Sequence, residues 1–200
     1  MIESTIAGFL IALGGTMYLS IEVKVIGAIM FSLGLLTILH FKYYLFTGKA
    51  GLLLTREIHP YDLGIIWCGN LLGVCIGASL VLMLNLGNEQ PLMHAAANII
   101  NTRINNLWIQ NIVLGIFCGL LMYIAVTSYA TKPWVTVMCV SAFILSGFNH
   151  CIADMYYFFL ASPFVDVPLA VFAILCTTLG NVIGCNIIPL CEMEKERGRF

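Results

Sequence analysis

The sequence predicts an all-α membrane protein with six transmembrane helices, of which the second and fifth are broken, arranged as an inverted three-plus-three repeat. Composition predicts the membrane, because 60% of the 200 residues are hydrophobic and only 10% are charged, whereas soluble domains average about 25% charged residues. Six spans of about 20 residues fit this length. Polar interruptions in two apolar stretches predict the breaks, and a repeated Gly-Asn-x-x-Gly motif predicts the repeat.

The same composition excludes several classes of function. So many apolar residues exclude a cytosolic enzyme, and the lipid membrane is the one partner that composition requires. A net charge of −1 without a basic run argues against nucleic-acid binding. The eight cysteines include no Cys-x-x-Cys pair and none at metal-ligand spacing from a histidine. We therefore expect buried thiols, no disulfide framework and no cofactor.

The first half of the chain predicts three spans. Residues 5–21 are apolar and end at a polar corner that holds Glu22 and Lys24. The stretch 25–54 is too long for one straight crossing, and it is interrupted by His40, Lys42, Thr47, Gly48 and Lys49. Such a break is tolerated only where the freed backbone faces protein or a water-lined cavity. The third span is expected over residues 63–86.

The second half predicts three further spans. A polar loop is expected over 85–106, and the fourth span follows at 107–128. The fifth stretch, 134–160, repeats the interruption of the second, at 146–150 and again at Asp154. The sixth span covers 169–190, and a charged tail, 192–200, follows it.

An internal repeat relates the two halves, about 1–87 and 104–191, of a single channel domain, 1–191. The Gly-Asn-x-x-Gly motif begins at Gly69 and again at Gly180. Because each half has three spans, the halves run in opposite directions through the bilayer, a plan typical of channels and transporters. The motif glycines fit helix packing equally well. The motif asparagines, Asn70 and Asn181, must find polar partners inside the bundle.

The distribution of basic residues predicts the orientation in the membrane. Lys24 and Arg103 lie in loops on one side, and five basic residues lie on the side of the termini: Arg56, Lys132, Lys195, Arg197 and Arg199. Cytoplasmic loops carry the excess of Lys and Arg. We therefore expect both termini, and the charged tail, in the cytoplasm.

Four segments resemble the formate/nitrite transporter family of pentameric anion channels. They are residues 31–35 (FSLGL), 45–48 (LFTG), 147–155 (GFNHCIADM) and 179–184 (LGNVIG), which together span nearly the whole chain. The resemblance implies an aquaporin-like protomer with its own pore and a homopentamer in a prokaryotic plasma membrane. It implies passage of small monovalent anions such as formate, nitrite, hydrosulfide or lactate, and a transporter rather than an enzyme.

The resemblance also assigns residues to the pore. Thr47 matches the threonine of the loop that breaks the second helix, and His150 matches the central pore histidine that this threonine faces. Asn181 matches a pore-lining asparagine, and Arg103 stands where a vestibule lysine is usual. The apolar constriction residues would be Phe31, Leu35, Phe143 and Met122.

Several positions depart from the family pattern. Asn149 replaces the usual Glu before the pore histidine, and further replacements stand at Lys42, Tyr44, Lys49 and Asp154. The family's amphipathic helix before the first span has no counterpart in this sequence. We still expect Asn149, which precedes His150, to be a pore residue. Asp154 is expected to form a buried ion pair with Lys42 or Lys49, or else to bind backbone while both lysines reach the cytoplasmic boundary.

These residues predict how an anion crosses. Arg103 would concentrate anions in a vestibule, and the apolar sleeve would strip water and favour the neutral weak acid. His150 is the pore candidate that exchanges a proton near neutral pH. One alternative is a family member retuned to a different small solute. A membrane redox subunit, which the scattered histidines disfavour, and a scaffold, which would not need broken helices, are the others.

Overall fold

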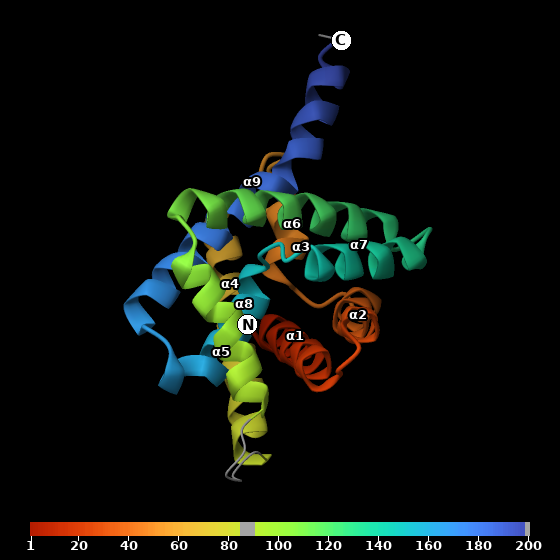
Figure 1. Ribbon diagram of the computed structural model, residues 1–200. Helices are drawn as coiled ribbons and strands as arrows, with labels where there is room; N and C mark the ends of the chain where they lie inside the picture. Colours follow the sequence, from red (N-terminus) through yellow and green to blue (C-terminus); the bar gives the residue numbers. More distant parts are fainter. Residues whose placement is uncertain (85–90, 199–200) are drawn as a thin grey trace.

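The computed structural model describes residues 1–84 and 91–198, and the regular elements there are all helices (Figure 1). Four are long and apolar enough to cross a membrane: α1 (Ile2–Ser20), α4 (Pro60–Leu84), α6 (Trp108–Ser128) and α9 (Val167–Glu196). Two pairs of shorter helices are α2 (Lys24–His40) with α3 (Phe46–Ala50) and α7 (Pro133–Leu145) with α8 (Cys151–Ala161). The others are α5 (Pro91–Asn105) and the 3-10 turn η1 (Ser162–Phe164). The predicted all-α membrane fold is confirmed.

The two predicted breaks, in 25–54 and 134–160, are confirmed and have the same local structure. After α2 and α7, one residue enters the left-handed region, Lys42 with φ 59° and Gly147 with φ 71°. The next N–H then bonds back to a helix carbonyl: Tyr43 N to Ile38 O and Phe148 N to Phe143 O, both at 2.9 Å. This turn ends helices and favours glycine at the left-handed position. Lys42 therefore carries backbone strain that Gly147 avoids.

Packing inside the two halves repeats in the same order, as the predicted inverted repeat requires. In the first half α1 packs against α2 and α4, and in the second half α6 packs against α7 and α9. The motif glycines allow the close approach, because a Cβ at Gly73 would overlap the backbone of Thr5 on α1 and a Cβ at Gly184 would overlap that of Ile116 on α6. The motif glycines therefore serve helix packing.

The predicted polar loop at 85–106 is wrong over 91–105, which form α5, while residues 85–90 lie outside the described residues. Asparagines and a histidine in this segment suggested a loop. However, the buried residues recur at helical spacing: Met93, Ala96, Ala97 and Ile100. This apolar stripe packs α5 against α8, and it brings Arg103 to the fifth stretch.

The last helix, α9, extends beyond the predicted span of 169–190. Asp166 precedes it and accepts a hydrogen bond from the Leu169 N–H at 3.0 Å, which satisfies one free donor at the helix start. The helix continues through Glu196, so most of the charged tail is helical, and its C-terminal end projects beyond the other helices (Figure 1). Residues 199–200 lie outside the described residues.

Candidate functional site

Asn70, on α4, holds the first break closed. Its Oδ1 accepts a hydrogen bond from the N–H of Phe46, the first residue of α3, at 2.7 Å. Its Nδ2 donates to the carbonyl of Tyr44 at 2.9 Å and to that of Ser4, on α1, at 2.7 Å. The backbone groups freed by the break are thus paired inside the protein, as a membrane interior requires.

Asn181, on α9, closes the second break in the same way. Its Oδ1 accepts from the N–H of Cys151, the first residue of α8, at 2.9 Å. Its Nδ2 donates to the carbonyls of Asn149 at 2.8 Å and of Gly115, on α6, at 2.9 Å. Asn181 has no exposed surface, and its donors are fully used. Asn181 therefore pairs the backbone groups freed by the second break, and its place at the pore surface stays a prediction.

Thr47 and His150 meet between the two breaks, as predicted, although 103 residues separate them. Thr47 Oγ1 lies 3.0 Å from His150 Nε2, and both side chains are buried. His150 immediately precedes α8, and its Nδ1 accepts a hydrogen bond from the Ala153 N–H at 3.2 Å. Because Nδ1 accepts, the neutral tautomer that satisfies both contacts carries its proton on Nε2 and donates it to Thr47 Oγ1.

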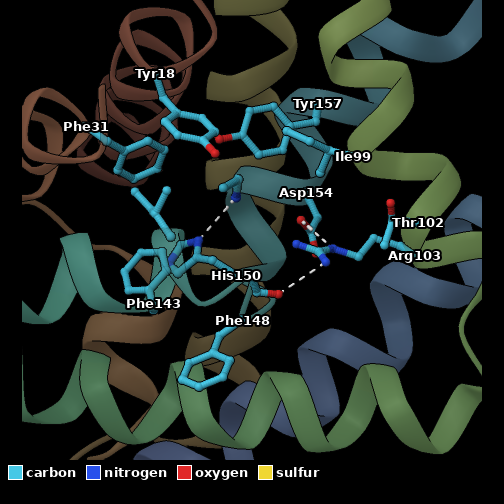
Figure 2. Close-up of a pocket in the computed structure, with 13 residues that line it drawn as sticks. Tyr18, Phe31, Ile99, Thr102, Arg103, Phe143, Phe148, His150, Asp154 and Tyr157 are labelled. Carbon is cyan, nitrogen blue, oxygen red and sulfur yellow. Dashed lines mark hydrogen bonds and ion pairs between the residues drawn. The ribbon is translucent and has the colours of Figure 1, made fainter. Parts of the chain in front are cut away.

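A cavity of about 240 Å³ opens beside His150, and we call it the Arg103 vestibule (Figure 2). Aromatic rings form its inner end: Phe143 stacks on His150 with ring centroids 5.6 Å apart, and Phe31 meets Phe143 edge-on at 6.3 Å. Arg103, from α5, and Asp154, from α8, lie on the other side of the vestibule. Arg103 therefore lines a cavity beside His150, and its role in capturing anions there stays a prediction.

A second cavity, of about 280 Å³, lies at the other end of α6, and we call it the lysine vestibule. Lys42 and Lys49 line it together with Tyr129, which follows the last residue of α6. Arg103, in contrast, lies shortly before α6 begins. The two vestibules therefore open at opposite ends of a helix long enough to cross a membrane.

A thin apolar layer separates the two vestibules. Phe31 lines the Arg103 vestibule and Leu35 lines the lysine vestibule, although they are one turn apart on α2, about 6 Å along its axis. These two, with Phe143 and Met122, are at most 2% exposed. The four predicted constriction residues are therefore all buried in the core, and two of them face opposite vestibules.

Asp154 pairs with Arg103, and the prediction that it pairs with Lys42 or Lys49 is wrong. Arg103 Nε lies 3.6 Å from Asp154 Oδ1. The physical reason is that α5, which was expected to be a loop, packs against α8 and covers Asp154 with Arg103. Lys49 Nζ instead lies 5.1 Å from the centroid of the Tyr44 ring, in cation–π range.

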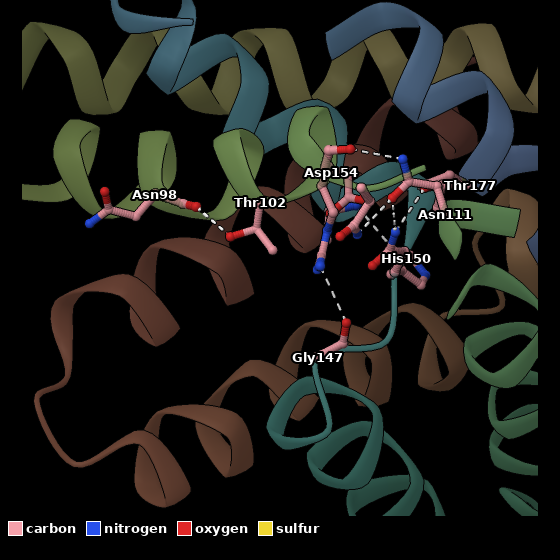
Figure 3. A network of polar contacts seen from close by, with 12 residues as sticks. Asn98, Thr102, Asn111, Gly147, His150, Asp154 and Thr177 are labelled. Atoms are coloured by element: carbon pink, nitrogen blue, oxygen red, sulfur yellow. Dashed lines mark hydrogen bonds and ion pairs between the residues drawn. The ribbon is translucent and has the colours of Figure 1, made fainter. Parts of the chain in front are cut away.

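Asn149 belongs to a buried polar network that includes Asn111 and Thr177, both labelled in Figure 3. Its Nδ2 donates to Asn111 Oδ1 at 3.0 Å and to Thr177 Oγ1 at 3.3 Å. Asn111 Nδ2 in turn donates to the backbone carbonyl of Arg103 at 2.8 Å. Asn149 thus ties the loop before α8 to the end of α5, and it lies beside His150 in sequence without facing either vestibule.

Several residues of the site were missed by sequence reasoning. Tyr18, Phe148 and Tyr157 line the Arg103 vestibule, yet in a chain so rich in aromatic residues nothing distinguishes them from core. Asn111 carried a usable signal, because an amide inside the apolar fourth span needs a polar partner. Cys185, whose Sγ donates to the carbonyl of Thr47 at 3.3 Å, gave no signal among eight cysteines.

Comparisons with known proteins agree with this architecture. Residues 1–191 match the family model described as Formate/nitrite transporter. The formate channels FocA of Haemophilus influenzae and Escherichia coli K12 are 28% and 29% identical to this chain over 151 and 148 residues. Each alignment covers 66% of this chain and 52% of the relative, so the chain spans about half the length of the curated relatives it matches.

Two solved structures have a similar fold. One, described as a pentameric formate channel with formate bound, has a TM-score of 0.81 at 21% identity and is matched over 98% of this chain and 95% of that chain. The other, described as an FNT family ion channel, has a TM-score of 0.74 at 22% identity, over 94% and 84% of the two chains. With the family match over residues 1–191, these findings identify the chain as an integral membrane protein that belongs to the formate/nitrite transporter family.

Proposed function

We propose that the protein conducts small monovalent anions, or their conjugate weak acids, across the membrane through a pore in each protomer. The observation that carries this proposal is the Thr47–His150 contact at a thin apolar layer between two vestibules. Family membership and the formate channels among its relatives support the substrate class. The relatives named above are channels, which favours transport over the redox alternative.

The proposed path joins the two vestibules through the apolar layer. A bare anion in this layer would lose its hydration without a compensating partner, which is costly. Arg103 would attract the anion into its vestibule, and passage past Phe31 and Leu35 would favour the neutral acid. His150 and Thr47, at the layer, would then exchange a proton with the cargo or orient it by hydrogen bonding.

We also propose that five protomers assemble around an axis in a prokaryotic plasma membrane with both termini in the cytoplasm. One structural relative is described as pentameric, and large apolar side chains such as Leu72, Phe117 and Leu179 remain exposed on the long helices. The excess of basic residues on the side of the termini supports the orientation. Images of purified particles with fivefold symmetry are the expected result, and any other symmetry contradicts the pentamer.

A flux assay in proteoliposomes tests the function. The panel is formate, nitrite, hydrosulfide, acetate, lactate and chloride, measured across a pH series. We expect at least one small weak acid to pass faster than in protein-free vesicles. Failure of every solute at every pH would overturn the proposal.

A pair of tryptophan variants tests the path. Leu35→Trp fills the apolar layer, whereas Leu33→Trp adds the same ring on the same helix at a position that is 45% exposed. We expect the first variant to stop flux and the second to leave it unchanged. Equal flux in both variants would show that the solute does not cross this layer.

A different small solute remains the second candidate function. The observation that favours it is the placement of charge, since Lys42 and Lys49 line one vestibule and a buried Asp154 faces the other. Such a pore would select another weak acid from the same panel. The flux ranking across the panel decides between the two candidates.

A further inference from the structure

The contact between Arg103 and Asp154 leaves both groups incompletely bonded. Arg103 Nε lies 3.6 Å from Asp154 Oδ1, too far for a good hydrogen bond. Arg103 Nη1 donates to the Gly147 carbonyl at 3.3 Å, but Nε has no hydrogen-bond partner among the described residues. Asp154 Oδ2 likewise accepts no hydrogen bond from the described part of the chain. Both unpaired atoms belong to residues that line the Arg103 vestibule (Figure 2).

Among the described residues, the side chains around Asp154 include one permanent positive charge, that of Arg103. Asp154 is 1% exposed. The groups around it are Arg103 from α5, Tyr18 from α1, Cys118 from α6, the Thr177 hydroxyl from α9, His150 just before α8, and Cys151 and Tyr157 on α8 itself. None of the described residues of α4, which also packs against α8, lines the vestibule. Within the described part of the chain, Arg103 is therefore the one charged side chain that compensates an ionised Asp154.

The charge state of Asp154 decides what Arg103 can bind. With Asp154 ionised, the pair sums to zero, and an incoming anion would leave one uncompensated negative charge in a buried cavity. With a proton on Asp154, the guanidinium is the single charge, and its planar fork matches a carboxylate or another small planar anion. The protonated carboxyl also becomes a hydrogen-bond donor toward the same anion. The vestibule volume of about 240 Å³ leaves room for such an anion.

We propose that Arg103 and Asp154 form a proton-linked anion site, in which one small planar anion and one proton enter the vestibule together. Asp154 is the group that takes the proton, and it occupies the anion's place on Arg103 when ionised. The inference rests on the proposed function, because it gives the vestibule of that path its means of selecting substrate. It adds a second proton site, Asp154 in the vestibule, ahead of the exchange at His150 in the apolar layer.

Formate binding to the purified protein tests this site. Isothermal titration with formate is run from mildly acidic to mildly alkaline pH, a range in which formate itself stays ionised. In the wild-type protein the dissociation constant should rise about tenfold per pH unit wherever Asp154 is ionised, because each anion must bring one proton. In Asp154→Asn, which keeps the size and removes the charge, formate binding should stay tight and nearly independent of pH.

A matched control and a direct proton count complete the test. Asp62→Asn makes the same chemical change on α4, outside the vestibule, and should keep the wild-type profile. Binding measured in buffers of different ionisation enthalpy should show uptake of about one proton per formate in the wild-type protein and none in Asp154→Asn. If Asp154→Asn does not fold, the number of protons that the wild-type protein takes up per formate tests the site on its own.

Three outcomes overturn the site. Formate binding without proton uptake, or a pH dependence that persists unchanged in Asp154→Asn, would show that Asp154 is a structural partner of Arg103. Absence of formate binding at any pH would overturn it as well. Flux in proteoliposomes separates this failure from failure of the proposed function, because a protein that transports formate without the linkage retains the function and loses only the site.

Discussion

Thr47 Oγ1 and His150 Nε2 lie 3.0 Å apart where two broken helices meet, and this contact makes the role of the histidine testable. In His150→Asn, the amide oxygen can still accept the Ala153 N–H, so α8 keeps its cap. The titratable proton is lost. We therefore expect flux of weak acids to persist but to rise less steeply as pH falls than in the wild-type protein.

Stopped-flow flux in proteoliposomes across a pH series checks this prediction. Thr47→Ser, which retains the hydroxyl that faces His150, is the control and should keep the wild-type profile. If His150→Asn transports with unchanged pH dependence, the histidine is structural and the proton enters with the substrate from bulk water.

Arg103→Gln should weaken capture of the anion without removing the chemistry of passage. At mildly acidic pH the half-saturating concentration should rise several-fold, while the flux at saturating substrate stays near that of the wild-type protein. Added salt should mimic the effect in the wild-type protein, since it screens the attraction. A lower saturating flux with an unchanged half-saturating concentration would contradict this role.

The pairing of Asp154 with Arg103 predicts a specific energetic coupling. At mildly alkaline pH, a double-mutant cycle of Arg103→Gln and Asp154→Asn should give an interaction free energy of about 1–3 kcal/mol. A cycle of Lys49→Gln and Asp154→Asn should give nearly none, because Lys49 lines the other vestibule. Unfolding in detergent measures both cycles, and a larger coupling to Lys49 would restore the pairing expected from sequence.

Asn181→Ala should destabilise the protein by about 2–4 kcal/mol. The change removes three hydrogen bonds, each worth about 1 kcal/mol net, and leaves buried backbone groups without partners. Asn70→Ala should cost a similar amount, because it removes the equivalent three bonds. Asn98→Ala, at an exposed position, is the control. Thermal unfolding in detergent measures the stability of each variant. Unchanged stability of Asn181→Ala would contradict the role of these hydrogen bonds in closing the break.

Gly119→Ala should destabilise the protein by about 1–3 kcal/mol through overpacking, because a Cβ there would overlap the backbone of Asn181. Gly64→Ala, in α4, meets nothing within 4 Å and is the matched control. It should be neutral or slightly stabilising, as alanine favours helix. Equal unfolding temperatures for the two variants would argue against close packing of α6 and α9.

The sequence was sufficient for the spans and breaks because hydropathy and its polar interruptions act locally. It also placed Thr47 opposite His150, since the inverted halves bring both breaks to one depth. It did not reveal α5, whose buried stripe is masked by asparagines on the other faces. The partner of Asp154 was therefore wrong as well, because Arg103 lies on α5. For Asn181, sequence shows that an amide is buried but not that it binds the backbone of Cys151, Asn149 and Gly115.

The hydrogen bonds of Asn70 and Asn181 bear on how the chain assembles during synthesis. Asn70, Ser4, Tyr44 and Phe46 all belong to the first half, so a ribosome that has delivered α1 to α4 has supplied the side chain that pairs the backbone at the start of α3. The second half likewise brings its own closure in Asn181. Each half can therefore enter the bilayer with the start of its short helix, α3 or α8, already paired by its own asparagine. Only the later docking of two finished halves creates the meeting point of Thr47 and His150, which makes the centre of the molecule the last part to form.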